Sequence, residues 1–192
     1  MIHNIAQGID VFTSNAFLVT GDRRVLVDTG ANFDAVDVLR DHGDGLEAIV
    51  LTHTHADHVG NLAAVTDAFD VDVWGYDESF TGVDHALEDG ETIQLGDHEY
   101  VAVHTPGHKD DHLCLYARDP AILFAGDLVF QNGSFGRTDL PEGDRATLVE
   151  SIDRLLEVVD PGLEEMHTGH GPSVTSEPYE HIELAARMAR SV

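Results

Sequence analysis

The chain has 192 residues, 42% of them hydrophobic, with 10 basic residues against 36 acidic ones. This length and composition suit one folded domain and exclude a disordered chain. The net charge of −26 repels nucleic-acid phosphates, and the sequence offers no basic patch to overcome that repulsion, so we expect no nucleic-acid partner. No apolar run approaches the ~20 residues that cross a bilayer, so we expect no membrane partner either.

Cysteine usage and the first residues bear on the compartment. The single cysteine, Cys114, rules out an internal disulfide bond and favours a cytoplasmic location. The N-terminal residues carry neither the basic region nor the long apolar region of a signal peptide, which predicts the same compartment. Because Cys114 lies in an apolar stretch, we expect a buried structural thiol and not a nucleophile.

Short apolar stretches alternate with helical periodicity through the first half of the chain. Four apolar stretches predict strands, over Asn15–Thr20, Val25–Val27, Leu46–Leu51 and Val71–Tyr76. Apolar residues at helical spacing predict helices over Phe33–Arg40 and Asn61–Phe69. The polar segment Thr52–Gly60, directly after the third of these strands, is predicted to be a loop.

The second half repeats this strand-rich style. Strands are predicted over Tyr100–His104, Leu113–Ala117, Ile122–Ala125 and Glu164–Thr168. An apolar stripe that stops at Pro161-Gly162 predicts a helix over Arg145–Val159, and a terminal helix is predicted over Tyr179–Arg190. Since no linker or repeat separates the halves, we expect a single domain over residues 1–192 with layered α/β architecture.

Candidate metal ligands are concentrated in the loop after the Leu46–Leu51 strand. His53, His55, Asp57 and His58 form the pattern H-x-H-x-D-H. On a loop that leaves a strand, alternate side chains can turn toward one point, and imidazole together with carboxylate suits zinc, iron or manganese. Because four such residues within six positions rarely arise by chance, the spacing predicts metal binding.

Three further candidate ligands each lie just beyond a later predicted strand. They are His108, Asp127 and His170, and each is flanked by small residues. Small neighbours let the backbone approach a site closely. The H-x-H-x-D-H loop alone cannot complete two metal shells, so we expect these three residues to supply the rest.

The order Asp28-Thr29-Gly30, the H-x-H-x-D-H motif, His108, Asp127 and His170 resembles the metallo-β-lactamase superfamily, over nearly the whole chain. The resemblance implies a four-layer αββα sandwich with the metal site at one edge. It also implies two divalent metal ions, zinc first, with iron or manganese as alternatives. His53, His55 and His108 would hold the first ion and Asp57, His58 and His170 the second, with Asp127 bridging both. Asp28 would support the ligands from behind.

The segments Leu123–Phe130, Gly133–Pro141 and Gly169–Pro172 are similar to the short glyoxalase II-like hydrolases. The resemblance implies a binuclear metal hydrolase that cleaves a small-molecule thioester, S-lactoyl-thiol, to lactate and free thiol through a metal-bridging hydroxide. Asp57 and Asp127 would orient this nucleophile. Residues 171–192 leave no room for the C-terminal helical domain with which full-length glyoxalase II grips glutathione, so the thiol carrier stays open.

Three other polar residues near these motifs have either a functional role or a structural or surface role. Arg137 falls where the family places a basic residue that binds the carboxylate of the thiol carrier, or it forms a salt bridge inside the sandwich. Lys109, the only lysine, contacts an anionic substrate or is a solvated surface residue. His112 supports the ligands or is polar surface. The remaining histidines are expected to be structural or surface residues: His3, His42, His85, His98, His104, His167 and His181.

Three other functions compete with thioester hydrolysis. Persulfide dioxygenases share the fold and the Gly-Arg-Thr-Asp segment but use one iron, on residues matching His53, His108 and Asp127. A nucleic-acid phosphodiesterase of the same superfamily fits the motif but not the charge. A non-catalytic metal-binding protein would be expected to lose ligands, whereas all seven are present here.

The acidic charge predicts a halophilic protein, adapted to a cytosol rich in salt. Crowded surface carboxylates repel one another until counter-ions screen them, and the Debye length falls to ~3 Å at 1 M salt. We therefore expect the melting temperature, followed by circular dichroism, to rise steeply between low and multimolar KCl. A melting temperature that stays flat across that range would contradict this prediction.

Overall fold

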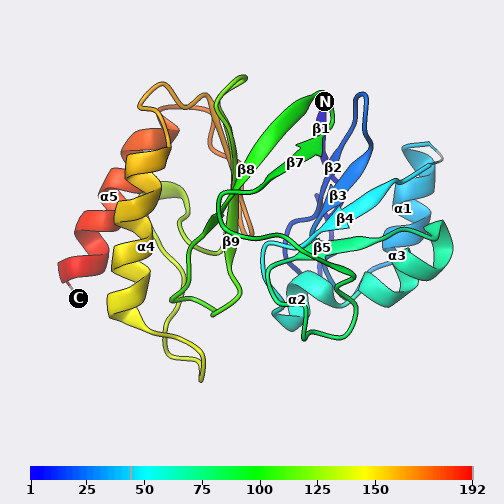
Figure 1. Cartoon of the computed structure of the whole chain (residues 1–192), viewed down its shortest axis with the longest axis horizontal. Coiled ribbons are helices and arrows are strands. Elements are labelled where there is room, and N and C mark those ends of the chain that lie inside the picture. Colours follow the sequence, from blue (N-terminus) through cyan, green and yellow to red (C-terminus); the bar gives the residue numbers. More distant parts are fainter. Residues whose placement is uncertain (44, 192) are drawn as a thin grey trace. The chain divides into compact units, whose positions relative to one another are not determined.

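The computed structural model describes residues 1–43 and 45–191, and these form two compact units. The first unit comprises residues 1–87 with 93–99, and the second comprises residues 88–92 with 100–192. Each unit combines strands with helices (Figure 1). The single domain expected over residues 1–192 stays a prediction.

The first unit is built on a six-stranded sheet with strand order β1-β2-β3-β4-β5-β6. The pairs β1–β2 and β2–β3 are antiparallel, while β3, β4, β5 and β6 run parallel to one another. Strands β2, β3 and β4 are buried at every position, which explains their unbroken apolar runs. The strands are β1 (Ile2–Asn4), β2 (Phe17–Val19), β3 (Val25–Val27), β4 (Ala48–Val50), β5 (Val73–Gly75) and β6 (His85–Ala86).

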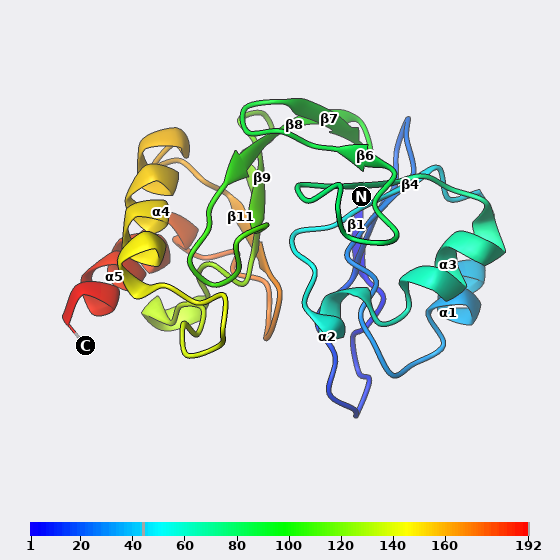
Figure 2. The same cartoon turned by 60° about the horizontal axis from the view of Figure 1, so that its bottom comes forward.

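Helices α1 (Ala35–Asp41) and α3 (Leu62–Phe69) cover this sheet, and they lie side by side in Figures 1 and 2. Leu39 of α1 and Val65 of α3 belong to the same apolar core as Leu26 of the sheet. Full burial of such a side chain contributes about 1.5–3 kcal/mol. This core therefore fixes the plane of the sheet from which the H-x-H-x-D-H segment departs.

The second unit is built on a sheet with strand order β11-β10-β9-β8-β7. Strands β8, β9 and β10 pair antiparallel, and β10 pairs parallel with β11. The parallel ladder has an irregularity between Phe124 and Gly126, directly before Asp127. The strands are β7 (Thr92–Leu95), β8 (His98–His104), β9 (Leu113–Ala117), β10 (Ile122–Gly126) and β11 (Glu165–Thr168).

Helices α4 (Arg145–Val158) and α5 (Pro178–Ser191) pack side by side in the second unit (Figure 2), and the short helix η1 (Gln131–Gly133) contacts α5. Ile152 of α4 and Ile182 of α5 join one core with Leu123 of β10. The side chain of Asp144 caps α4 by accepting a hydrogen bond of 2.7 Å from the backbone N of Thr147. The capped helix α4 and the equally long α5 pack in one core with β10, the strand that precedes Asp127.

The structure corrects several of the predicted elements. The segment Thr52–Gly60 is not a loop throughout, because it contains the one-turn helix α2 (Ala56–Val59). The sequence patterns also missed β1, β6 and β7, which are short and partly exposed. The other predicted strands and helices are present, with ends that differ by a few residues. Across residues 1–43 and 45–191, no helix has the length and apolar character needed to cross a membrane.

Candidate metal centre

The ligand segment of the first unit emerges from two adjacent parallel strands. Val27, the last residue of β3, pairs with Val50, the last residue of β4. Parallel strands end at the same edge of a sheet, so Asp28 and the segment that begins at Thr52 start side by side. The backbone N of Asp28 donates a 2.9 Å hydrogen bond to the carbonyl of Val50, which keeps the two segments in register.

Asp28 is a buried carboxylate that organises this segment. Its Oδ1 accepts a 2.8 Å hydrogen bond from the backbone N of Thr52, and its Oδ2 accepts one of 2.7 Å from the Thr52 hydroxyl. The same Oδ2 lies 2.8 Å from Nδ1 of His58, whose side chain is fully buried. A carboxylate on one ring nitrogen fixes the orientation of an imidazole and presents its other nitrogen as the ligand. The structure therefore agrees with the supporting role expected for Asp28.

Thr52 passes this orientation on to His53. The Thr52 hydroxyl gives its proton to Asp28, so its oxygen is the acceptor in the 3.1 Å contact with His53 Nδ1. Nδ1 of His53 then carries the proton, and Nε2 is left with the lone pair. That Nε2 lies 3.1 Å from Nδ1 of His55. Two nitrogen ligands on a tetrahedral ion with bonds of 2.0–2.1 Å are about 3.3 Å apart, so this spacing fits a shared metal.

The one-turn helix α2 carries the other two candidate ligands of the motif, Asp57 and His58. The ring of His58 lies beside that of His53, with ring centroids 4.0 Å apart. Asp57 is half-buried, and its backbone carbonyl accepts a 3.2 Å hydrogen bond from the backbone N of Ser14. The structure thus gathers His53, His55 and His58 and places Asp57 on the same turn.

The second unit brings its three predicted ligands together. Asp127 and His170 follow the parallel strands β10 and β11, so they leave the sheet at one edge. Oδ2 of Asp127 lies 3.4 Å from Nε2 of His108 and 3.5 Å from Nε2 of His170. Nδ1 of His108 donates a 2.8 Å hydrogen bond to the carbonyl of Arg137, which leaves Nε2 as the ligand atom. These spacings also match donors around one ion, at about 3.3 Å.

His112 is a support that sequence reasoning left open between two roles. Its ring is fully buried, so the surface interpretation is wrong. Nε2 accepts a 2.9 Å hydrogen bond from the backbone N of Asp127, so Nδ1 carries the proton and donates to the Thr105 hydroxyl at 2.8 Å. The neutral ring thereby holds the backbone of Asp127 in place. Its position four residues after His108 was the one available signal in the sequence.

Glycines allow the ligand loops of this unit to pack closely, as the small residues around the ligands predicted. A Cβ atom at Gly136 would collide with the carbonyl oxygen of Asp127. A Cβ atom at Gly107, where φ is +121°, would collide with the backbone of Leu148 on α4. The loop that carries His108 therefore lies directly against α4, and the segment around Gly136 lies directly against the backbone of Asp127.

Arg137 and Lys109 both depart from one of their expected roles. The side chain of Arg137 is 61% exposed, so a salt bridge in the interior is wrong. Its Nε and Nη2 donate to the two carboxylate oxygens of Asp139 at 2.7 Å each. Lys109 is not a solvated lysine, because its side chain is 14% exposed and its Nζ lies 3.7 Å from Asp111 and 3.5 Å from Glu142.

The residues expected to be structural behave accordingly. Burial raises the pKa of the Cys114 thiol to about 12, so it stays protonated and unreactive. His167 stacks on Phe124 with ring centroids 5.0 Å apart, and burial lowers its pKa to about 4. His181 accepts a 2.8 Å hydrogen bond from the backbone N of Asn132.

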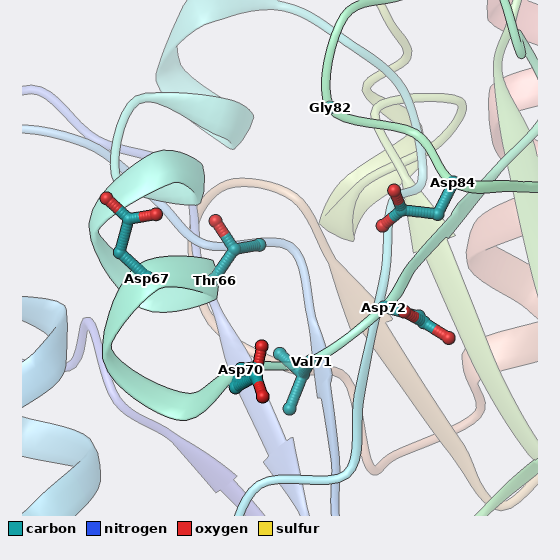
Figure 3. Close-up of a pocket in the computed structure, with 7 residues that line it drawn as sticks. All are labelled: Thr66, Asp67, Asp70, Val71, Asp72, Gly82 and Asp84. Carbon is teal, nitrogen blue, oxygen red and sulfur yellow. The ribbon is translucent and has the colours of Figure 1, made fainter.

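A separate acidic hollow of about 420 Å³ lies in the first unit, next to α3 and β5. Figure 3 shows the residues that line it. Asp84 accepts a 2.9 Å hydrogen bond from the backbone N of Val73, and Asp72 lies 3.0 Å from Nε2 of His85. These two carboxylates hold β5 and β6 together. We assign them a structural role and the hollow no ligand.

The chain belongs to the metallo-β-lactamase superfamily, whose family model matches residues 9–170. This match, together with similar solved structures, confirms the predicted fold class. The superfamily is metal-dependent, and the donor sets described above fit metal binding. That the set on the first unit and the set on the second unit hold the same pair of ions stays a prediction.

Three proteins are similar to this chain over most of its length. A hydroxyacylglutathione hydrolase, GloC of Haemophilus influenzae, is 28% identical over 87% of this chain and 90% of its own length. The crystal structure of BLEG-1, described as a B3 metallo-β-lactamase, has a TM-score of 0.80 and 30% identity, over 94% of this chain and 96% of that one. TTHA1623, solved in a di-iron-bound form, has a TM-score of 0.72 and 33% identity, over 92% of this chain and 98% of that one.

The contacts of Asp28 predict its effect on metal affinity. Asp28→Asn keeps the shape of the side chain but replaces one carboxylate oxygen with an amide that cannot accept from His58. We expect affinity for zinc, measured by competition with a chelator, to fall by about 10–100-fold. Asp37→Asn, on the exposed face of α1, is the matched control. Equal zinc affinity in the Asp28 variant and the control would count against the role of Asp28.

Proposed function

We propose that this protein is a glyoxalase II-like thioester hydrolase that holds two divalent metal ions. The observation that carries the proposal is the position of Asp127. Its Oδ2 lies 3.4 Å from Nε2 of His108 and 3.5 Å from Nε2 of His170, as a carboxylate shared between two metal ions would. The similarity to GloC, whose name gives hydroxyacylglutathione as its substrate, supports the reaction class. One ion would be held by His53, His55 and His108, the other by Asp57, His58 and His170, with Asp127 shared.

Bound metal ions would supply Lewis acidity and a water acidic enough to attack at neutral pH. Imidazole and carboxylate donors accept zinc, iron and manganese, and we propose zinc as the native ion. The similarity to a di-iron protein keeps iron as an alternative. Asp127, with its backbone held by His112, and Asp57, on the turn of α2, would orient the attacking water.

In the proposed reaction, the oxygen of water bonds to the thioester carbonyl carbon and the C–S bond breaks. The electron pair of that bond goes to sulfur, which takes up the proton that the attacking water loses, and the products are a carboxylic acid, lactate for a lactoyl substrate, and a free thiol. Thiols have pKa values of about 8.5, so the leaving group requires no strong protein acid. Arg137 would bind the carboxylate of the thiol carrier, since the two-pronged guanidinium group matches a carboxylate.

The location that we propose for this protein is the cytoplasm.

A persulfide dioxygenase is the second candidate, because its family shares the segment Gly136-Arg137-Thr138-Asp139. That enzyme would use one iron, on His53, His108 and Asp127. The two candidates therefore differ in the number of ions bound, and they differ in whether His58 and His170 act as ligands.

Metal content separates the two candidates. We expect close to two ions per chain by elemental analysis after reconstitution with zinc, iron or manganese and removal of excess metal. His170→Ala should lower the content to near one. One ion in the wild-type protein, together with oxygen consumption in the presence of a persulfide, would support the dioxygenase.

Removal of the shared carboxylate should abolish hydrolysis. Asp127→Ala removes a donor proposed for both ions, so we expect the rate of thioester cleavage to fall by several powers of ten. The far-ultraviolet circular dichroism spectrum should be retained, because the core of α4 and α5 contains no atom of this side chain. Glu150→Ala, on the exposed face of α4, is the control.

The assay follows absorbance at multimolar KCl with several acyl groups and thiols. A β-lactam is included because BLEG-1 is described as a β-lactamase. Full activity in Asp127→Ala would rule out the proposed role of this residue. Failure of the metal-loaded wild-type protein to cleave any thioester would rule out the hydrolase.

A further inference from the structure

The exposed side chain of Arg137 is already occupied by a carboxylate of its own loop. Nε and Nη2 of Arg137 donate to Oδ1 and Oδ2 of Asp139 at 2.7 Å each, in the two-pronged geometry that guanidinium groups use for carboxylate ligands. The side chains are 61% and 70% exposed. Hydrogen bonds from Arg137 lower the pKa of Asp139 to about 2, so Asp139 is ionised throughout the physiological range.

This pair is fastened to the candidate ligands of its own unit. The carbonyl of Arg137 accepts a 2.8 Å hydrogen bond from Nδ1 of His108, and the preceding Gly136 packs against the backbone of Asp127. The guanidinium therefore projects into solvent from a backbone that contacts two ligands. The other cation beside His108 is Lys109, which is largely buried and lies between Asp111 and Glu142. Of these two cations, Arg137 is the accessible one.

We propose that Asp139 competes with the substrate's carboxylate for Arg137 and thereby sets the preference of the enzyme for the charge of the thiol carrier. This inference rests on the proposed thioester hydrolysis. A carrier with a carboxylate reaches the guanidinium only by displacing Asp139, whereas a neutral carrier leaves the pair intact. Because exposed ion pairs are weak, a substrate carboxylate can displace Asp139 reversibly. Asp139 therefore reduces the extra affinity of the enzyme for an anionic carrier but does not abolish it.

The competition has a second consequence in this chain. Asp139 and an incoming carboxylate cannot both occupy the same guanidinium fork, and two carboxylates at one site repel each other. A substrate bound through Arg137 therefore leaves Asp139 without its two 2.7 Å hydrogen bonds. The variant that removes this repulsion should favour anionic carriers over neutral ones.

Two substrates that differ by one carboxylate measure this preference. They are S-lactoyl-N-acetylcysteine, which is anionic, and S-lactoyl-N-acetylcysteamine, which is neutral, and the quantity compared is the ratio of their kcat/KM values. We expect Asp139→Asn to raise the ratio of anionic to neutral by up to about fivefold, mainly through a lower KM for the anionic substrate. Arg137→Gln should lower the ratio, and adding Asp139→Asn to it should produce no further rise.

Asp153→Asn is the matched control, because it removes the exposed carboxylate that pairs with Arg190 and changes the net charge equally. Its ratio should equal that of the wild type. An unchanged ratio in Asp139→Asn, or an equal rise in Asp153→Asn, overturns the competition while thioester hydrolysis still stands. Absence of cleavage of both substrates by the metal-loaded wild type overturns hydrolysis and the competition together. Asp139→Ser, which is also uncharged, repeats the measurement if the asparagine variant folds poorly.

Discussion

The buried carboxylate of Asp28 is the constraint on which the ligand segment of the first unit depends. It accepts hydrogen bonds from the backbone and hydroxyl of Thr52, and it contacts His58 at 2.8 Å. A buried charge is costly unless it is paired and hydrogen-bonded, so Asp28 and its partners hold one another in a single arrangement. That arrangement decides which nitrogen of His58 and, through Thr52, which nitrogen of His53 remains for a metal.

Candidate ligands of the second unit are also oriented by hydrogen bonds, but there the partners are neutral groups. His108 is oriented by the carbonyl of Arg137, and Asp127 is held through its backbone by His112. In each unit candidate ligands follow a parallel pair of strands, β3 with β4 and β10 with β11, whereas His108 follows β8, which pairs antiparallel with β9. Parallel pairing brings residues distant in sequence to one edge, and hydrogen bonds on the far side of each ring then select the ligand atom. Sheet topology and ring orientation are therefore two separate requirements of the metal sites.

Sequence patterns predicted the part of this arrangement that depends on residue type and spacing. The stripe of Leu148, Ile152 and Leu155 was sufficient to locate α4, because apolar burial follows helical periodicity. The turn α2 was missed because its four residues include two candidate ligands and show no apolar period. The partners of Arg137 and Lys109 were also missed, since ion pairs within loops depend on how the loops fold and leave no periodic trace in the sequence.

The negative charge of the chain gives the Arg137–Asp139 pair its significance. With a net charge of −26, the long-range field opposes any anionic thiol carrier. In the concentrated salt that this charge predicts, the Debye length is only ~3 Å at 1 M, so that field is largely screened. Interactions at hydrogen-bond distance are screened least, and Arg137 and Asp139 meet at 2.7 Å. Under the proposed function, discrimination among carriers in such a solvent would therefore depend on contact pairs of this kind, and not on the overall charge that repels every carboxylate alike.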